Sequence, residues 1–142
     1  MENDLIKAKQ LLSDGIYTCV LCQGERCRTS TARGVRPLVE FLNEGGFQGF
    51  SAADKVIGKA TAFLYVLLGV RAIYTPVISE SALAILQTHG IRVEFDLAVP
   101  AIFNRSRTGF CPMETAVRDI EDPCAAVAAI EDALDKLLHR QN

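Results

Sequence analysis

The spacing of hydrophobic residues along the first third of the chain predicts two helices on either side of a β-hairpin. Residues 4–12 show apolar spacings of three and four, typical of a short amphipathic helix, at Leu5, Ala8, Leu11 and Leu12. Residues 17–22 and 26–31 are rich in strand formers and flank a turn at Gly24, which predicts the hairpin. A second helix is expected around Pro37, ending at Gly45-Gly46, with apolar positions Val35, Leu38, Val39 and Leu42.

The central part of the chain predicts a buried helix followed by a strand, a helix and another strand. The buried helix is expected from Ser51 to Leu68, because its residues are apolar nearly all round from Val56 onward. Residues 70–74 and 91–95 are expected to be strands joined by a helix over residues 79–89. A helical crossover lets two strands lie parallel in one sheet.

After a loop over residues 100–109, a short helix is expected to begin at Cys111-Pro112, and a last helix at Asp122-Pro123. The last helix should pack on the sheet through an apolar stripe at Val127, Ile130, Leu134, Leu137 and Leu138. The predicted fold class is therefore α/β: a three-layer α/β/α sandwich whose mixed sheet combines an N-terminal hairpin with parallel crossover strands.

Length and charge restrict the classes of protein that this chain can belong to. Its 142 residues predict one domain over residues 1–142. With 15 Lys and Arg against 17 Asp and Glu, no overall positive field would recruit nucleic acid or an anionic membrane. The polar, acidic N-terminus lacks the pattern of a secretory signal, so a cytoplasmic protein with five reduced cysteines is expected.

Four segments carry a resemblance to known proteins: Tyr17–Leu21, Gly49–Ala60, Val77–Glu80 and Gly109–Glu114. Together they resemble a family of small prokaryotic proteins of unknown function that have a cytidine-deaminase-like fold, and the similarity runs over residues 4–138. This resemblance implies a cytidine-deaminase-like α/β/α sandwich and leaves the activity open.

Zinc deaminases carry His-x-Glu or Cys-x-Glu at one helix start and Pro-Cys-x-x-Cys at the next. Matching the helix starts puts Ala52-Ala53-Asp54 at the first motif, and Ser79 and Ala82 at the two cysteine positions of the second. Alanine and serine do not replace thiolate or imidazole ligands, so a metal-free protein without other cofactors is expected. In this match Asp54 keeps a carboxylate at the position of the proton shuttle.

Ser51 and Asp54 have the spacing of a helix capping box, which explains both residues without a ligand. The same helix start would also attract an anion such as phosphate, with Lys55 as an added cation. The two roles are compatible.

Two polar loops are further candidates for ligand contact. Residues 29–37 contain Arg33 and Arg36 among hydroxyl side chains, and residues 104–109 begin at Asn104. Either loop also suits an ordinary solvated connection. Ligands of open α/β sheets gather beyond the carboxyl ends of the strands, where these loops and the Ser51 segment are expected to converge.

The cysteines allow a further kind of chemistry. Cys111 precedes a helix start, which suits a nucleophilic thiol, but the only histidines, His89 and His139, are poorly placed as bases, so a buried structural role is the alternative. Cys19 and Cys22 would face opposite sides of one strand, whereas Cys22 and Cys27 could meet across the hairpin as a dithiol.

Three hypotheses follow. In the first, a metal-free sandwich binds a small phosphorylated or nucleotide-like ligand, with Asp54 as general acid or base and Lys55 as charge stabiliser; whether it turns the ligand over is open. Its expected ligand-binding residues are Arg33, Arg36, Ser51, Ser79, Asn104 and Cys111. The second is a non-catalytic assembly or regulatory module, a homo-oligomer formed through Leu134, Leu137 and Leu138. The third is a cysteine redox or metal protein.

Overall fold

The computed structural model describes residues 2–32, 34–102 and 112–140, with the side chains of residues 2 and 138–140 left out. Helices and strands follow one another in this order: α1 (Glu2–Ser13), β1 (Cys19–Gln23), β2 (Arg26–Ser30), α2 (Arg36–Glu44), β3 (Ser51–Asp54), β4 (Val56–Ile57), α3 (Lys59–Leu68), β5 (Ala72–Ser79), α4 (Glu80–Thr88), β6 (Arg92–Val99), α5 (Pro112–Ala116) and α6 (Pro123–Arg140). The predicted α/β class is confirmed.

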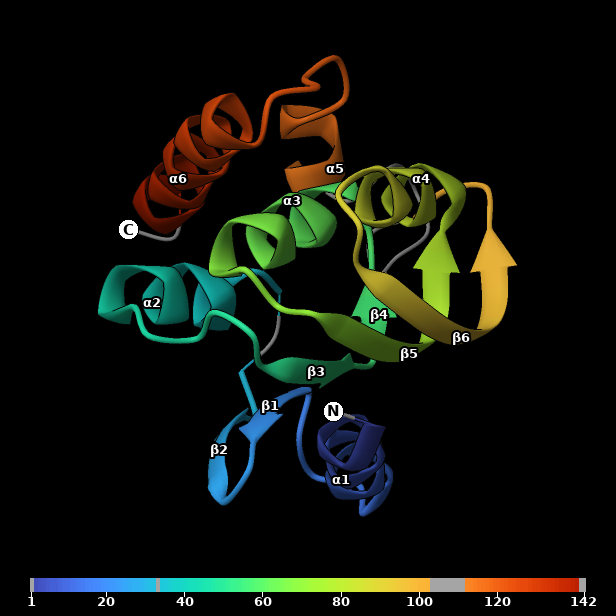
Figure 1. The fold of residues 1–142 in the computed structure, drawn as a ribbon. Coiled ribbons are helices and arrows are strands. Elements are labelled where there is room, and N and C mark those ends of the chain that lie inside the picture. The colour runs from blue at the N-terminus through green and yellow to red at the C-terminus, as the bar shows by residue number, and fades with distance from the viewer. Residues whose placement is uncertain (1, 33, 103–111, 141–142) are drawn as a thin grey trace.

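The strands form one mixed, open sheet of six strands (Figure 1). The hairpin β1–β2 is antiparallel, and β1 also pairs antiparallel with β3. β3 and β4 both lie parallel to β5, and β6 lies parallel to β5 on its other side. The predicted hairpin and the predicted parallel crossover from β5 through α4 to β6 are both confirmed.

Helices cover both faces of the sheet. α1 packs on β1, β3 and β5 from one side, while α2, α3 and α4 lie on the other (Figure 1). Two hydrophobic clusters fill the spaces between these layers. The smaller cluster lies under α1 and includes Leu5, Leu12, Val20, Ala53 and Tyr74. The larger cluster surrounds α3, whose side chains are buried along most of its length.

The sequence predicted that the last helix packs on the sheet, and this prediction is wrong. α6 packs instead on α3 and α5, where Ala126 and Ile130 are buried (Figure 1). Because α3 already separates this part of the chain from the sheet, the apolar stripe of α6 forms an additional outer layer.

The prediction of one helix from Ser51 to Leu68 is wrong over residues 51–58. Residues 51–57 form β3 and β4, and α3 begins only after Gly58. The error has a physical reason: β3 is buried on both faces, with Ala52 in the α3 cluster and Ala53 in the α1 cluster. A short apolar run of this kind does not distinguish a buried strand from a buried helix.

The sheet has an irregularity that crosses three strands. Two rows of residues in register both belong to the α3 cluster: Ala52, Ile73 and Val93, and then Ile57, Ile78 and Ala98. The rows are five residues apart on each strand, yet residues five apart on a regular strand point to opposite faces. Each strand therefore contains a break in side-chain alternation between the rows.

Pro76 lies in the middle of this break. It has no backbone N–H to donate to a neighbouring strand. The register on both sides of Pro76 places it opposite Lys55, the residue between β3 and β4, where pairing with β5 is interrupted. β5 and β6 both bend at about half their length (Figure 1). The bend lets the second half of the sheet curve around α4.

Packing of α6 on α3 predicts a large effect of truncating Ile130, which is fully buried. Ile130→Ala should lower the free energy of unfolding by about 2–5 kcal/mol, whereas Ile6→Ala, at a residue 54% exposed, should change it by less than about 0.5 kcal/mol. Urea denaturation followed by circular dichroism measures both. Equal effects of the two substitutions would contradict the packing described for α6.

Candidate functional site

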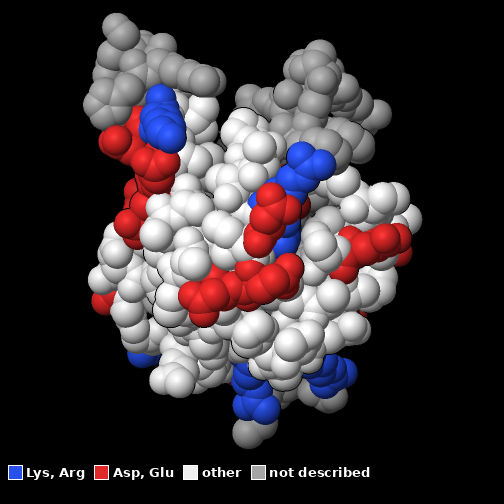
Figure 2. All heavy atoms as spheres, turned by 90° about the horizontal axis from the view of Figure 1, so that it is seen from above, with Lys and Arg blue, Asp and Glu red and all other residues white. Residues whose placement is uncertain are grey.

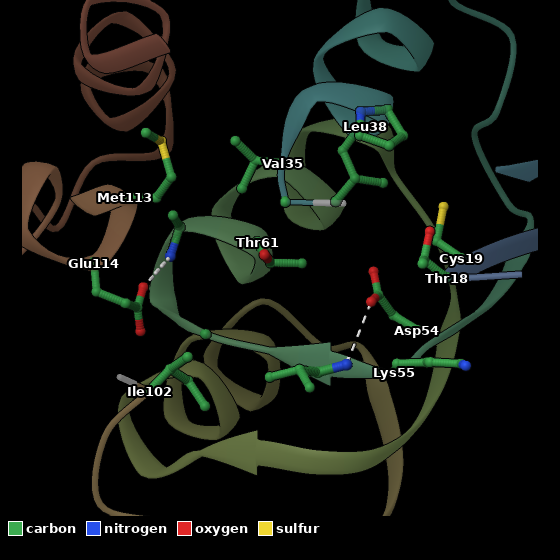
Figure 3. Close-up of a pocket in the computed structure, with 15 residues that line it drawn as sticks. Thr18, Cys19, Val35, Leu38, Asp54, Lys55, Thr61, Ile102, Met113 and Glu114 are labelled. Carbon is green, nitrogen blue, oxygen red and sulfur yellow. Dashed lines mark hydrogen bonds between the residues drawn. The ribbon is translucent and has the colours of Figure 1, made fainter. Parts of the chain in front are cut away.

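A cavity of about 230 Å³ opens where β3 ends, beside the break in the sheet (Figure 3). Its walls come from the start of β1, the start of α2 and the residues just before it, the β3–β4 connection, the first turn of α3, the segment after β6, and α5. Most of the wall is apolar, including Val35, Leu38, Ile102 and Met113, and the polar lining residues are Thr18, Cys19, Asp54, Lys55, Thr61 and Glu114.

Asp54 is the central polar group of this cavity. Its carboxyl accepts a hydrogen bond at Oδ2 from the Tyr65 hydroxyl of α3, at 2.7 Å, and a long one at Oδ1 from the Val56 amide, at 3.4 Å. Cys19 lies opposite Asp54 in the β1–β3 register, and its side chain also interacts with Tyr65. Three elements, β1, β3 and α3, thus each contribute one group to a compact Cys19–Tyr65–Asp54 cluster.

Burial makes Asp54 the proton-exchanging member of the cluster. Loss of solvent raises the pKa of Asp54 from 3.8 to about 7, although hydrogen bonds from Tyr65 and from two backbone amides oppose this rise. Burial and the neighbouring Asp54 charge raise the pKa values of both the Cys19 thiol and the Tyr65 hydroxyl well above their ordinary range. At neutral pH, therefore, Cys19 and Tyr65 keep their protons while Asp54 gains and loses one.

Glu114 of α5 forms the opposite wall and binds the start of α3. Its carboxylate accepts a hydrogen bond from the Lys59 amide at 2.8 Å. It also accepts one from the Ala60 amide at 3.0 Å (Figure 3). A negative charge is favourable at a helix N-terminus. Gly58 permits this contact, since a Cβ at that position would lie 2.5 Å from the carboxylate. The anion position at this helix start is thus filled by the chain's own side chain.

Of the two predicted catalytic residues, Asp54 faces the cavity, but at the end of a strand rather than at a helix start. Lys55 also lines the cavity, yet its exposed ammonium reaches the carbonyl oxygen of Gly15 at 3.4 Å, away from Asp54 (Figure 3). The predicted capping box of Ser51 and Asp54 is wrong, because both residues belong to β3.

None of the predicted binding residues that the structure describes lines this cavity. Ser51 is buried at the opposite end of β3, and its hydroxyl has no hydrogen-bond partner among the described residues. Ser79 caps α4 by accepting from the Ala82 amide at 3.2 Å and does not line the cavity. Arg36 is exposed at the start of α2, next to lining residue Val35. Arg33, Asn104 and Cys111 lie outside the described residues.

Sequence reasoning missed Tyr65, Glu114 and the role of Cys19. The role of Tyr65 can be predicted only when the start of α3 is placed correctly, because its hydroxyl reaches from this helix to Asp54 on a strand. Within the described parts of the chain, no three His, Cys, Asp or Glu side chains gather closely enough to hold a metal ion. His89 bonds through its ring to the Ile85 carbonyl at the end of α4, outside the cavity lining.

Comparison with known proteins identifies the family. The model of a domain of unknown function, DUF1893 (TM1506), matches residues 7–134. The chain belongs to the DUF1893 family. Among solved structures, it is similar to a DUF1893 family protein, TM1506, from Thermotoga maritima, with 25% sequence identity and a TM-score of 0.82 over 96% of this chain and 91% of that one. No curated protein matches the sequence.

These findings support the predicted membership in a family of unknown function. They leave the cytidine-deaminase-like assignment open. Among the helices that the structure describes, none combines the length and the apolar character needed to cross a bilayer.

The contact between Gly58 and Glu114 predicts a substitution whose effect changes sign with its background. Gly58→Ala should destabilise the protein by about 1–3 kcal/mol, because the new methyl group expels a carboxylate that satisfies two helix amides. In a Glu114→Ala background the same change should be neutral or stabilising, since Gly58 has a negative φ that alanine adopts readily. A double-mutant cycle from urea denaturation measures this coupling; simple additivity would contradict it.

The raised pKa of Asp54 predicts a specific pH dependence of stability. The folded carboxyl holds its proton more tightly than the unfolded one, so Asp54 favours folding below about pH 4, and this contribution is lost as the pH rises through about 7. Asp54→Asn should therefore gain stability relative to wild type between pH 4 and 8, by roughly 2–4 kcal/mol in all.

Urea denaturation across this pH range tests the prediction, with Asp14→Asn, at an exposed aspartate just after α1, as the control. A stability difference between Asp54→Asn and wild type that stays constant with pH would show that the folded carboxyl has an ordinary pKa.

Proposed function

We propose that this DUF1893 protein binds a small nucleotide-like ligand whose base enters the cavity and hydrogen-bonds to Asp54. The observation that carries the proposal is a carboxyl with a pKa of about 7 in a mostly apolar cavity. Apolar walls with one or a few convergent polar groups are typical of small-molecule sites, and perturbed pKa values gather at functional sites. The volume of 230 Å³ lies below the range of roughly 300–1,000 Å³ for drug-sized ligands, which favours a smaller molecule.

The charges around the cavity favour the base over the phosphate as the buried part of the ligand. A phosphate inside it would lie near Asp54 and Glu114, while Lys55 is directed toward Gly15. A nucleobase edge instead offers N–H donors, which an ionised carboxylate accepts from. It also offers ring nitrogen acceptors, to which a protonated carboxylic acid donates. A phosphorylated ligand would therefore keep its phosphate outside the cavity.

The outer helical face supports the same orientation. In the view from above Figure 1, acidic side chains are more prominent than basic ones (Figure 2). Between residues 112 and 137 the chain has Glu114, Asp119, Glu121, Asp122, Glu131, Asp132 and Asp135 against Arg118 and Lys136. Such a surface repels polyanions, which supports a small ligand over nucleic acid as the partner.

Asp54 has the properties of a general acid or base toward the bound ring. A group with a pKa near the working pH is the most effective in proton transfer. Tyr65 donates to Oδ2 and holds the carboxyl in place at the cavity wall. In this proposal Asp54 exchanges a proton with a ring nitrogen, while Tyr65 is a positioning residue.

The fold supports a nucleotide-like ligand by analogy. The strand sequence β2-β1-β3-β5, with β6 beyond β5 and an antiparallel hairpin at the edge, suits the cytidine-deaminase-like sandwich that the sequence resemblance implies. With α3 beginning at Lys59, the counterpart of the first zinc motif would lie at Gly58–Ala60 instead of at residues 52–54. Glycine, lysine and alanine are not zinc ligands, and the Lys59 ammonium lies 3.0 Å from the Arg118 carbonyl. Zinc hydrolysis therefore forms no part of the proposal.

The alternative, an assembly module, has less support. Leu134 and Leu137, two residues of its expected interface, are partly buried and pack against the chain's own core. The Leu138 side chain lies outside the described residues. No contact among the described residues favours an assembly module.

The proposed ligand class is tested by thermal unfolding with cytidine, adenosine or ribose 5-phosphate as separate probes at pH 6 and 8. A nucleoside at about 100 times its Kd should stabilise the protein by roughly 2.7 kcal/mol, which raises the Tm by about 5–10 °C for a chain of this size. Asp54→Ala should abolish the shift, whereas Asp14→Asn should retain it.

A shift produced by ribose 5-phosphate alone would show that the phosphate is the buried part. The absence of any shift with all three probes at millimolar concentration would refute a nucleoside-binding cavity. A heteronuclear NMR titration of the wild type checks that the affected amides lie around the cavity.

A further inference from the structure

The β-hairpin holds two cysteines directly opposite each other, on the side of the sheet away from the cavity cluster. Cys22 on β1 and Cys27 on β2 are partners in the register, and their Sγ atoms lie 3.0 Å apart. Directly opposite residues of an antiparallel pair have Cα atoms about 4.5–5.5 Å apart, which lies within the range that a disulfide spans. Bond formation at about 2.05 Å needs a movement of only about 1 Å.

The structure around the hairpin keeps the two thiols in this position. The Lys7 ammonium donates to the Gly24 carbonyl at 3.3 Å, and the Asp4 carboxylate accepts from the Gly24 amide at 3.0 Å. Both contacts tie the hairpin turn to α1. Cys22 is itself part of the buried cluster beneath that helix. These contacts therefore hold the two thiols close together before a disulfide forms.

We propose that Cys22 and Cys27 form a reversible intrachain disulfide by exchange with a small-molecule disulfide such as oxidised glutathione. The Cys27 thiolate attacks one glutathione sulfur, forming a mixed disulfide and releasing one glutathione thiolate. Cys22 then loses its proton and attacks the Cys27 sulfur, which releases the second glutathione. Two protein thiols are oxidised to one disulfide, and one oxidised glutathione is reduced to two thiols.

The two cysteines have different roles because their exposures differ. Cys27 is partly exposed on the edge strand, so it is the sulfur that an external disulfide reaches. Cys22 is fully buried, and burial together with its contact to Cys27 raises its pKa to about 12. Cys22 consequently acts only in the second step, which becomes faster as the pH rises.

Reaction of the folded, full-length protein with oxidised glutathione tests the proposal by peptide mass mapping after acid quenching and alkylation. Trypsin cuts after Arg26, between the two cysteines, so a disulfide appears as a linked pair of peptides. We expect a Cys22–Cys27 link without retained glutathione, complete reversal by dithiothreitol, and more than tenfold faster closure at pH 9 than at pH 7.

Two variants separate the steps. Cys22→Ser should stop at a stable glutathione adduct on Cys27, and Cys27→Ser should leave Cys22 unmodified; circular dichroism confirms that both are folded. The Cys22→Ser variant also shows that the linked peptide does not arise from Cys19, which lies in the same tryptic fragment. A lasting glutathione adduct on wild-type Cys27, or modification of the exposed Cys124 with the hairpin unreacted, would overturn the proposal.

Discussion

The break in side-chain alternation across β3–β4, β5 and β6 is the constraint on which the candidate site depends. It occurs at the same level in all three strands, so the strands keep their register while the sheet bends. Pro76 interrupts the ladder of a central strand, a place where proline is normally excluded, and no amide is available opposite Lys55. The cavity lies beside this break, and the three residues at the β3–β4 connection, Asp54, Lys55 and Val56, line it.

Burial at the end of β3 explains the raised pKa of Asp54. As the last residue of β3, Asp54 has its carboxyl on the α3 side, where it meets the buried Tyr65 hydroxyl. One strong hydrogen bond and weak backbone contacts do not offset the loss of solvent, and the pKa rises to about 7. A fold that keeps such a carboxyl at neutral pH gives up stability there, which is a cost that functional sites commonly carry.

The sequence predicted elements whose signal is local and failed where packing decides. Local sequence patterns were enough to predict three features: the amphipathic helix α1, the hairpin around Gly24 and the crossover from β5 to β6. The segment 51–57 has no such pattern, because a strand buried on both faces lacks alternation. The same error hid most of the site: moving the helix start from Ser51 to Lys59 changes which residues stand at a helix N-terminus. Asp54 was found as a candidate, while Tyr65 and Glu114 depend on contacts between distant segments.

Glu114 explains why the helix-start chemistry expected from the sequence gives way to the chemistry of one carboxyl. Amides at a helix N-terminus bind an anion only while they are free. At α3 the amides of Lys59 and Ala60 already bind Glu114, which approaches because Gly58 has no side chain. An external phosphate would have to displace a carboxylate that the same dipole stabilises. With these helix amides occupied, the ligand class proposed for the cavity is inferred from the Asp54 carboxyl and its apolar surroundings.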